Sequence, residues 1–237
     1  MILKGKIAVI TGASSGIGAA LSQALVAKGA TVYGIARRVN LLEDLRASLG
    51  AEFIPVPLDI TDMNAVSNWV DVTFSDATPD ILVNNAGLGF FGNIEDISPD
   101  DWHTMMNVNL NGVFYITRKL VPLFKRNEQH THIVNIASVA GLIGNPQISG
   151  YNATKFGLRG FSEALFKELR FDKIKVTCVY PGSIATEFFE KSGSSTHDHM
   201  MKADDVAHSI IHVLETPDNF LIDEITMRPL NPKPPQK

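Results

Sequence analysis

Short apolar runs rich in β-branched residues alternate along the chain with longer segments whose apolar residues recur at helical spacing. We predict strands from these runs at Lys6–Thr11, Thr31–Ala36, Phe53–Leu58, Ile81–Asn84, His132–Ala137, Lys175–Tyr180 and Phe220–Thr226. Most of the runs are apolar throughout, which is typical of strands that are covered on both faces. The prolines in Phe53–Leu58 favour an edge position or an irregular strand, because proline cannot donate a hydrogen bond to a sheet.

The segments between the strands predict helices at Gly18–Lys28, Leu41–Leu49, Met63–Ser75, Pro99–Arg126, Gly150–Arg170 and Ala203–Glu215. This alternation predicts an α/β protein, namely a doubly wound Rossmann fold with about seven parallel strands and helices on both faces. No change in composition marks a second domain, so we expect a single domain over residues 1–237. Residues 187–202 include a polar, serine-rich stretch and are predicted to form a mobile substrate loop. The proline-rich residues 231–237 are predicted to form an extended tail.

The composition excludes several function classes. Of the 237 residues 45% are hydrophobic, which is enough for a sizeable core. The net charge of −4 disfavours a nucleic-acid-binding function, and the single cysteine, Cys178, rules out an internal disulfide and a multi-cysteine metal site. We find neither a signal peptide nor an apolar stretch of the ~20 residues that span a membrane, so we expect a cytoplasmic protein without membrane contact.

A glycine-rich segment ends the first predicted strand and opens the first predicted helix: Thr11-Gly12-Ala13-Ser14-Ser15-Gly16-Ile17-Gly18. Glycine allows a tight turn and lets backbone N–H groups approach an anion, which the positive end of the helix then faces. No Lys-Ser or Lys-Thr pair follows the last glycine, so a P-loop nucleotidase is disfavoured. The position favours a dinucleotide over a turn without ligand, with contacts from Gly12, Ser14, Ser15, Gly16, Ile17 and Gly18.

The residues after the second predicted strand distinguish between the two nicotinamide dinucleotides. NAD enzymes usually place an acidic residue there, whereas this chain has Arg37 and Arg38 and no Asp or Glu from Ala19 to Leu42. Arg37 would pair with a ribose 2′-phosphate, and Ser14 would add a hydroxyl contact. We therefore predict NADP(H) as the cofactor; the alternative is that both arginines are only solvated.

Tyr151 and Lys155 are separated by one turn of a predicted helix and share one face of it. A cation ~4 Å from a phenol at an effective dielectric of ~20 contributes ~4 kcal/mol, which lowers the tyrosine pKa by about three units before desolvation and screening are counted. The phenol would then serve as a general acid–base near neutral pH. Ser138 follows a buried strand at the carboxyl edge of the sheet, where it would hold a substrate carbonyl beside the tyrosine.

Asn109 is a further candidate, in a run of asparagines inside the predicted helix Pro99–Arg126. Asparagine and glycine are poor helix formers, so we expect a local kink, with an ordinary irregular helix as the alternative. Spacing alone does not distinguish Asn109 from Asn107 or Asn111.

The histidines and the cysteine suggest no further chemistry. His208 and His212 share a helix face, and His197 and His199 are near neighbours, but zinc needs three or four converging ligands. We therefore predict solvated histidines and no metal. Cys178 lies in the middle of a predicted strand, so we expect an inert buried thiol.

In combination, these motifs resemble the short-chain dehydrogenase/reductase family over nearly the whole chain. The resemblance is carried, in order, by Thr11–Gly18, Asp59, Asn84–Gly87, Asn109, Ser138, Tyr151-x-x-x-Lys155 and Pro181-Gly182. It implies that Tyr151 is the catalytic acid–base, that Lys155 lowers its pKa and binds the nicotinamide ribose, and that Ser138 orients the carbonyl. It further implies a relay water at Asn109, adenine contacts from Asp59 and Ile60, ribose contacts from Asn85 and Ala86, carboxamide contacts from Ile184 and Thr186, and cofactor contacts from Gly87, Pro181 and Gly182.

The resemblance implies an NADP(H)-dependent oxidoreductase that interconverts a small-molecule carbonyl compound and an alcohol by hydride transfer. It also implies a homodimer or homotetramer built on the two longest predicted helices. Gly89-Phe90-Phe91-Gly92 and the segment Asp223–Pro229 are similar to the sepiapterin-reductase and 3-hydroxy-acid (serine-type) dehydrogenase branches. Phe188 and Phe189 either cover the nicotinamide as a lid or pack as a hydrophobic turn.

Three alternatives stand beside this interpretation. A non-catalytic NADP-binding redox sensor has no need of Ser138, Tyr151, Lys155 and Asn109 together. Sugar-nucleotide epimerases and dehydratases share Tyr-x-x-x-Lys, but they usually have a longer carboxyl-terminal part and a different glycine spacing. A 3-oxoacyl-carrier-protein reductase would end in a Gly-Gly segment after the last strand, which this chain lacks.

Overall fold

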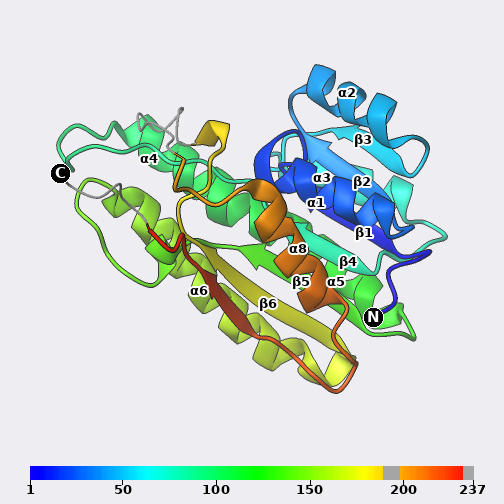
Figure 1. Ribbon diagram of the computed structural model, residues 1–237. Helices are drawn as coiled ribbons and strands as arrows, with labels where there is room; N and C mark the ends of the chain where they lie inside the picture. The colour runs from blue at the N-terminus through cyan, green and yellow to red at the C-terminus, as the bar shows by residue number, and fades with distance from the viewer. Residues whose placement is uncertain (189–197, 232–237) are drawn as a thin grey trace.

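In residues 1–188 and 198–231, which the computed structural model describes, the chain folds around one parallel sheet of seven strands (Figure 1). The strands are β1 (Ile7–Thr11), β2 (Thr31–Ala36), β3 (Phe53–Pro57), β4 (Ile81–Asn84), β5 (Thr131–Ile136), β6 (Ile174–Pro181) and β7 (Glu224–Met227). Their order is β3-β2-β1-β4-β5-β6-β7. The chain runs outward from β1 to β3 and then returns to β4 on the other side of β1. The predicted doubly wound fold is therefore confirmed, and β3 is at an edge.

Helices cover both faces of the sheet, as predicted (Figure 1). They are α1 (Gly16–Ala27), α2 (Val39–Leu49), α3 (Met63–Thr73), α4 (Pro99–Met106), α5 (Gly112–Arg126), α6 (Ser149–Leu169) and α8 (Ala203–Leu214). Buried residues of α1 and α8 pack on one face, and those of α3, α5 and α6 pack on the other. The described part of the chain also contains the π-helical turn η1 (Asn107–Asn111) and the 3₁₀ turns η2 (Val139–Gly141) and η3 (Arg170–Asp172).

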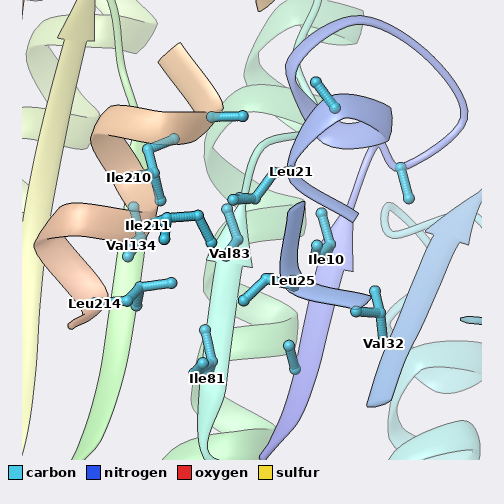
Figure 2. Close-up of a cluster of buried hydrophobic side chains, with 14 of the residues drawn as sticks. Ile10, Leu21, Leu25, Val32, Ile81, Val83, Val134, Ile210, Ile211 and Leu214 are labelled. Atoms are coloured by element: carbon cyan, nitrogen blue, oxygen red, sulfur yellow. The ribbon is translucent and has the colours of Figure 1, made fainter. Parts of the chain in front are cut away.

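The strands bury side chains on both faces, which explains their continuously apolar sequences. In β1, Ala8 and Ile10 belong to the cluster beneath α1 and α8, whereas Val9 between them belongs to the cluster on the opposite face. Each fully buried aliphatic side chain of this kind stabilises the fold by roughly 1.5–3 kcal/mol. Figure 2 shows the first cluster, where strands and helices contribute Ile10, Val83, Val134, Leu21, Leu25, Ile210, Ile211 and Leu214.

The last strand begins later than predicted, at Glu224 instead of Phe220. Carbonyl oxygens of the preceding segment are bound by side chains of β6. The Lys175 ammonium donates to the Phe220 oxygen at 2.7 Å, and the Thr177 hydroxyl donates to the Ile222 oxygen at 2.6 Å. These side-chain bonds take the place of backbone bonds at Phe220 and Ile222, and the Asp223 carbonyl oxygen accepts from the N–H of Cys178 at 2.8 Å.

Two other differences concern helices and loops. The predicted helix Pro99–Arg126 is divided into α4, η1 and α5, and a π-helical turn lies where we expect a local kink. The predicted substrate loop and tail fall largely on residues 189–197 and 232–237, which lie outside the described residues.

In the part that the structure describes, no helix is both long enough and apolar enough to cross a membrane.

Candidate active site

The loops that leave the carboxyl ends of the strands enclose a cavity of about 580 Å³. Parallel strands bring these loops to one edge of the sheet, where ligands of such folds bind. Most of the predicted site residues line the cavity: Gly12, Ser14, Ser15, Gly16, Ile17, Arg37, Arg38, Asp59, Ile60, Asn85, Ala86, Gly87, Ser138, Tyr151, Lys155, Pro181, Gly182, Ile184 and Thr186. Gly18 and Asn109 are buried and do not line it.

The turn between β1 and α1 suits an anion at the start of the helix. Gly12 and Gly16 have φ angles of +67° and +55°, in the left-handed region that favours glycine. Ser15 is the N-cap residue of α1, but its side chain makes no capping hydrogen bond, and no acidic residue occupies the first turn. The first N–H groups of α1 are therefore not capped by Ser15, and together with the helix dipole they favour a phosphate group.

The ends of β1 and β4 are held together by the side chains of Thr11, the last residue of β1, and Asn85, which follows β4. The Thr11 hydroxyl accepts hydrogen bonds from the backbone N–H groups of Asn85 and Ala86, both at 3.0 Å. The Asn85 amide donates to the carbonyl oxygens of Thr11 at 3.0 Å and Gly12 at 3.1 Å. A Cβ at Gly12 would lie 2.8 Å from the Ala86 Cα, and one at Gly18 would lie 2.3 Å from the Gly12 oxygen. The turn can approach β4 this closely only with glycine at both positions.

Arg37 and Arg38 follow β2 and have different partners. Arg38 donates to the hydroxyl groups of Ser14 at 3.0 Å and Ser15 at 2.6 Å. It also forms an ion pair with Glu187 at 2.7 Å. Arg37 is mostly exposed and pairs with Asp59 at 3.8 Å. Ser14 therefore contacts the guanidinium group of Arg38. That Arg37 and Ser14 bind a ribose 2′-phosphate stays a prediction.

Tyr151, Ser138 and Lys155 come together near the end of β5 and the start of α6. Tyr151 lies in the first turn of α6, with Lys155 one turn further along the same helix. The Ser138 hydroxyl accepts from the N–H of Ala140 at 3.1 Å and donates to the Pro181 carbonyl oxygen at 3.4 Å. It also lies near enough to the Tyr151 phenol to lower its pKa. The buried Lys155 ammonium donates to the Ile136 carbonyl oxygen at 2.9 Å and lies 5.6 Å from the centre of the Tyr151 ring.

Burial dominates the electrostatics of this end of the cavity. Burial raises the pKa of Tyr151 to about 12, and the nearby Ser138 hydroxyl offsets part of that rise. Burial also lowers the pKa of Lys155 to about 8. The expectation that Lys155 brings the phenol pKa near neutrality is not met by the protein alone. Desolvation disfavours the charged form of both groups, and the ammonium is bound to a backbone carbonyl.

The π-helical turn η1 directs Asn109 inward. Asn109 is 1% exposed, whereas Asn107 and Asn111 are exposed and hydrogen bonded to each other at 2.8 Å. The Asn109 amide donates to the Leu88 carbonyl oxygen at 2.8 Å and the Thr154 hydroxyl at 3.0 Å, and its oxygen accepts from the N–H of Leu88 at 3.0 Å. Of these three asparagines, Asn109 is the one bonded to the cavity wall, and its part in catalysis stays a prediction.

The loop after β6 crosses toward the β1–α1 turn. Thr186 contacts this turn, since a Cβ at Gly16 would lie 3.2 Å from the Thr186 Cγ2. Ile184 is 5% exposed and forms an isolated parallel bridge with Met201. Phe188 contacts the Tyr151 ring, with ring centres 5.5 Å apart, whereas Phe189 lies outside the described residues. The loop therefore borders both the phosphate end and the tyrosine end of the cavity.

Asn152, next to Tyr151, is a residue that the sequence analysis missed. Its amide donates to the carbonyl oxygens of Ala140 at 2.6 Å and Ile143 at 2.9 Å, and its oxygen accepts from the N–H of Asn145 at 3.1 Å. These bonds hold the loop after η2 against the start of α6. The only signal in the sequence was a polar residue beside the tyrosine, which does not reveal its partners.

Within residues 1–188 and 198–231, no group of three or more His, Cys, Asp or Glu side chains could hold a metal ion. His208 and His212 are both exposed on α8, and His197 lies outside the described residues. Cys178 is buried in β6, and burial raises the pKa of its thiol, which disfavours the nucleophilic thiolate.

Comparison with known proteins agrees with the fold and the motifs. Residues 6–197 match the model of the short chain dehydrogenase family. Nodulation protein G of Rhizobium sp. (strain N33) is 39% identical over 203 residues, which cover 85% of this chain and 82% of that protein.

Two solved structures share the whole architecture. One is a 3-ketoacyl-(acyl-carrier-protein) reductase from Brucella melitensis complexed with NADH, with 31% identity and a TM-score of 0.87 over 98% of this chain and 100% of that one. The other is the closed form of a serine dehydrogenase complexed with NADP+, with 30% identity and a TM-score of 0.86 over 93% and 94%. With its sheet order, its glycine-rich turn and its Tyr-x-x-x-Lys helix, this chain belongs to the short-chain dehydrogenase/reductase family.

Proposed function

We propose that this protein is an NADP(H)-dependent oxidoreductase that interconverts a small-molecule carbonyl compound and its alcohol. The observation that carries the proposal is the common cavity: Tyr151, Ser138 and Lys155 line the same cavity as the uncapped start of α1 and the side chains of two arginines. A hydride donor that carries phosphate groups fits such a cavity, with its phosphate groups at the start of α1 and its reacting end near Tyr151. Family membership makes a nicotinamide dinucleotide the matching cofactor.

The residues near β1 and β2 fit the phosphate groups of NADP(H). The left-handed glycines and the start of α1 suit the diphosphate, and a Cβ at Gly12 would obstruct the turn. Arg38 already contacts the Ser14 hydroxyl, so both side chains would bind a ribose 2′-phosphate by charge-assisted hydrogen bonds, with Arg37 beside them. Among the family members above, the serine dehydrogenase structure contains NADP+ and the Brucella reductase contains NADH. We therefore assign the choice of cofactor in this chain to its two arginines.

The residues around the tyrosine supply the proton chemistry. When bound, NADPH supplies the hydride that the carbonyl carbon receives, and the products are the alcohol and NADP+. The Ser138 hydroxyl donates a hydrogen bond to the carbonyl oxygen and stabilises the negative charge that develops there. Tyr151 transfers its phenolic proton to the same oxygen and takes it back in the reverse direction. The Lys155 ammonium stabilises the tyrosinate that remains, because opposite charges attract strongly where water is excluded.

The remaining predicted residues take supporting roles in this proposal. Asn109 fixes the backbone of Leu88 at the cavity wall and takes part in the relay that returns a proton to the tyrosine. Ile184 and Thr186 contact the carboxamide end of the cofactor. Asp59 and Ile60, which follow β3, contact the adenine.

We also propose that the enzyme is a homo-oligomer built on α5 and α6. Each of these helices exposes an aromatic side chain: Phe114 of α5 is 47% exposed, and Phe156 of α6 is 42% exposed. Large apolar side chains of this kind are covered when two copies of the helices pack together.

The replacement Tyr151→Phe tests the proposed function directly. We expect kcat for carbonyl reduction to fall by roughly 10²–10⁴-fold, because the general acid is lost, while NADPH affinity is nearly unchanged. Turnover is followed by NADPH absorbance and affinity by calorimetry. Tyr115→Phe, on α5 and outside the cavity lining, is the matched control and should keep full activity. Retained turnover in Tyr151→Phe, or NADPH binding without turnover of any carbonyl compound by the wild type, would contradict the proposal.

The replacements Arg37→Ala and Arg38→Ala test the cofactor preference. Each should weaken NADPH binding by roughly 10–100-fold, the effect of losing one charge-assisted hydrogen bond to a phosphate, with a smaller loss for NADH. The ratio of the two dissociation constants is the informative quantity, because the Arg38 variant also loses its ion pair with Glu187. Arg126→Ala, at the exposed end of α5, serves as control. An equal loss of NADPH and NADH affinity would refute a role in 2′-phosphate binding.

The buried Lys155 charge generates a prediction about stability and pH. Because its pKa is lowered from 10.5 to about 8, folding releases a proton between these values, and stability rises with pH across that window. Lys155→Met should therefore raise the free energy of unfolding at pH 7 by on the order of 2 kcal/mol, after allowance for one lost hydrogen bond. The gain should shrink as the pH rises toward 10.5.

Urea unfolding at several pH values measures this difference. Lys167→Met on the same helix removes an exposed lysine paired with Glu163, and its effect should stay within about 0.5 kcal/mol at every pH. A Lys155→Met variant that is less stable than the wild type at pH 7 would show that the buried ammonium does not destabilise the fold.

A further inference from the structure

Three aromatic rings meet at the tyrosine end of the cavity. Phe91 comes from the loop after β4, Phe188 from the segment after β6 and Tyr151 from α6. The ring centres of Phe91 and Tyr151 are 5.7 Å apart, those of Tyr151 and Phe188 are 5.5 Å apart, and those of Phe91 and Phe188 are 6.2 Å apart. These separations lie in the range of favourable aromatic contacts. We call these three residues the aromatic cluster.

Gly89 makes the convergence of the three rings possible. A Cβ at this position would lie 2.8 Å from Cε1 of Phe91, 3.1 Å from Cδ2 of Tyr151 and 3.2 Å from Cζ of Phe188. Its φ angle is not in the left-handed region, so the requirement for glycine here is one of space and not of backbone conformation. Any larger residue would push the cluster apart.

The surroundings of the aromatic cluster are apolar and partly accessible. Met105 and Ala140 are buried beneath it, and Leu88, Phe90 and Ile148 are only partly buried against it. Leu88, Phe90 and Ile148 also line the cavity, so a ligand that reaches Tyr151 contacts their side chains. The wall beside the acid–base residue therefore favours an apolar group.

The cations of the described cavity lining already have partners within the protein. Arg37 pairs with Asp59, and the Arg38 guanidinium is already bound to the hydroxyl groups of Ser14 and Ser15 and to the Glu187 carboxylate. The Lys155 ammonium is buried and bound to the Ile136 carbonyl oxygen. Burial of a carboxylate beside the aromatic cluster would thus cost desolvation free energy that no new ion pair offsets. The carboxylate of Glu187 is engaged by Arg38, so it is not available to pair with a substrate cation at this end.

We propose that the substrate is an uncharged ketone that carries an aryl group, held against Phe91 and Phe188 with its carbonyl oxygen between Ser138 and Tyr151. Gly89 and Phe91 are then specificity-determining residues. This inference rests on the proposed carbonyl reduction and names its substrate class. A flat apolar group gains both buried area and ring contacts at the aromatic cluster, whereas a 3-oxo acid anion gains neither.

A matched set of ketones tests the proposal in steady-state kinetics with NADPH. Ethyl 3-oxo-3-phenylpropanoate is the neutral aryl ketone. The corresponding free carboxylate, 3-oxo-3-phenylpropanoate, is the anion, and ethyl 3-oxobutanoate has methyl in place of phenyl. We expect kcat/KM for the aryl ester to exceed that for the methyl ketone by roughly 10–100-fold. The anion should be poorer than the aryl ester by at least about 10-fold, because its charge is buried without a partner.

Variants of the cluster separate substrate binding from a general loss of activity. Phe91→Ala should lower kcat/KM for the aryl ester by roughly 10-fold, mainly through KM, with a smaller loss for the methyl ketone. Phe91→Leu should recover part of that loss, and Gly89→Ala should lower kcat/KM for the aryl ester by displacing the rings.

Phe171→Ala in η3 removes a phenylalanine that is 85% exposed, and it should leave kcat/KM for all three substrates unchanged. Equal kcat/KM values for phenyl and methyl ketones, or a preference for the anion or for a trimethylammonium ketone, would overturn the proposal.

A binding measurement keeps the inference separate from the proposed function. Calorimetry with the NADPH-saturated protein compares 3-phenylpropanamide, which is neutral and unreactive, with 3-phenylpropanoate. Tighter binding of the amide, weakened in Phe91→Ala, would support the aryl pocket even if no ketone were reduced, in which case only the proposed function would fail. No binding of the amide, or tighter binding of the carboxylate, would overturn the aryl pocket whatever the turnover.

Discussion

Thr11 and Asn85 exchange hydrogen bonds across the boundary between β1 and β4, and the rest of the site depends on how closely these two strand ends approach. The sheet order reverses its direction at this boundary, so the β1–α1 turn and the β4 loop open a cleft between them. Gly12 and Gly18 are required there because a Cβ at either would meet backbone atoms. The approach aligns the start of α1 with one end of the cavity, while β5 and α6 supply the other.

Exclusion of water is the second organising constraint. Burial raises the pKa of Tyr151 to about 12 and lowers that of Lys155 to about 8, so the protein holds both groups in an environment that penalises their charges. The fold stabilises this arrangement through the apolar layers on both faces of the sheet and through the hydrogen bonds of Asn109 and Asn152. In such surroundings, a charge that forms on the substrate oxygen or the phenol interacts strongly with nearby dipoles.

Much of the fold could be predicted from the sequence because its signals are local, whereas many of the candidate site residues came from the family resemblance and their roles stay predictions. Continuous apolar runs indicated strands that are buried on both faces. The glycines of the β1–α1 turn indicated a tight turn and a close approach of its backbone. The prolines of β3 indicated an edge strand, and the weak helix formers around Asn109 indicated the kink that became η1.

Features set by distant partners could not be predicted in the same way. The start of β7 depends on bonds from Lys175 and Thr177 of β6, and the association of Ser14 with Arg38 depends on side-chain direction after β2. The tyrosine pKa was misjudged because a charge at helical spacing is visible in the sequence, whereas the desolvation of both groups is not. The role of Asn152 is equally invisible, since its partners become neighbours only when η2 packs on α6.

Hydrogen–deuterium exchange with and without NADPH tests most directly whether the strand-end loops form one cofactor site. We predict that NADPH slows amide exchange together in residues 12–19, 85–89 and 182–186, which border the cavity from three different strands. Amides near the amino ends of the strands, on the side of the sheet away from the cavity, should exchange at an unchanged rate. Protection confined to one of these loops, or no protection at all, would contradict the claim that cofactor-binding and catalytic residues converge on one site.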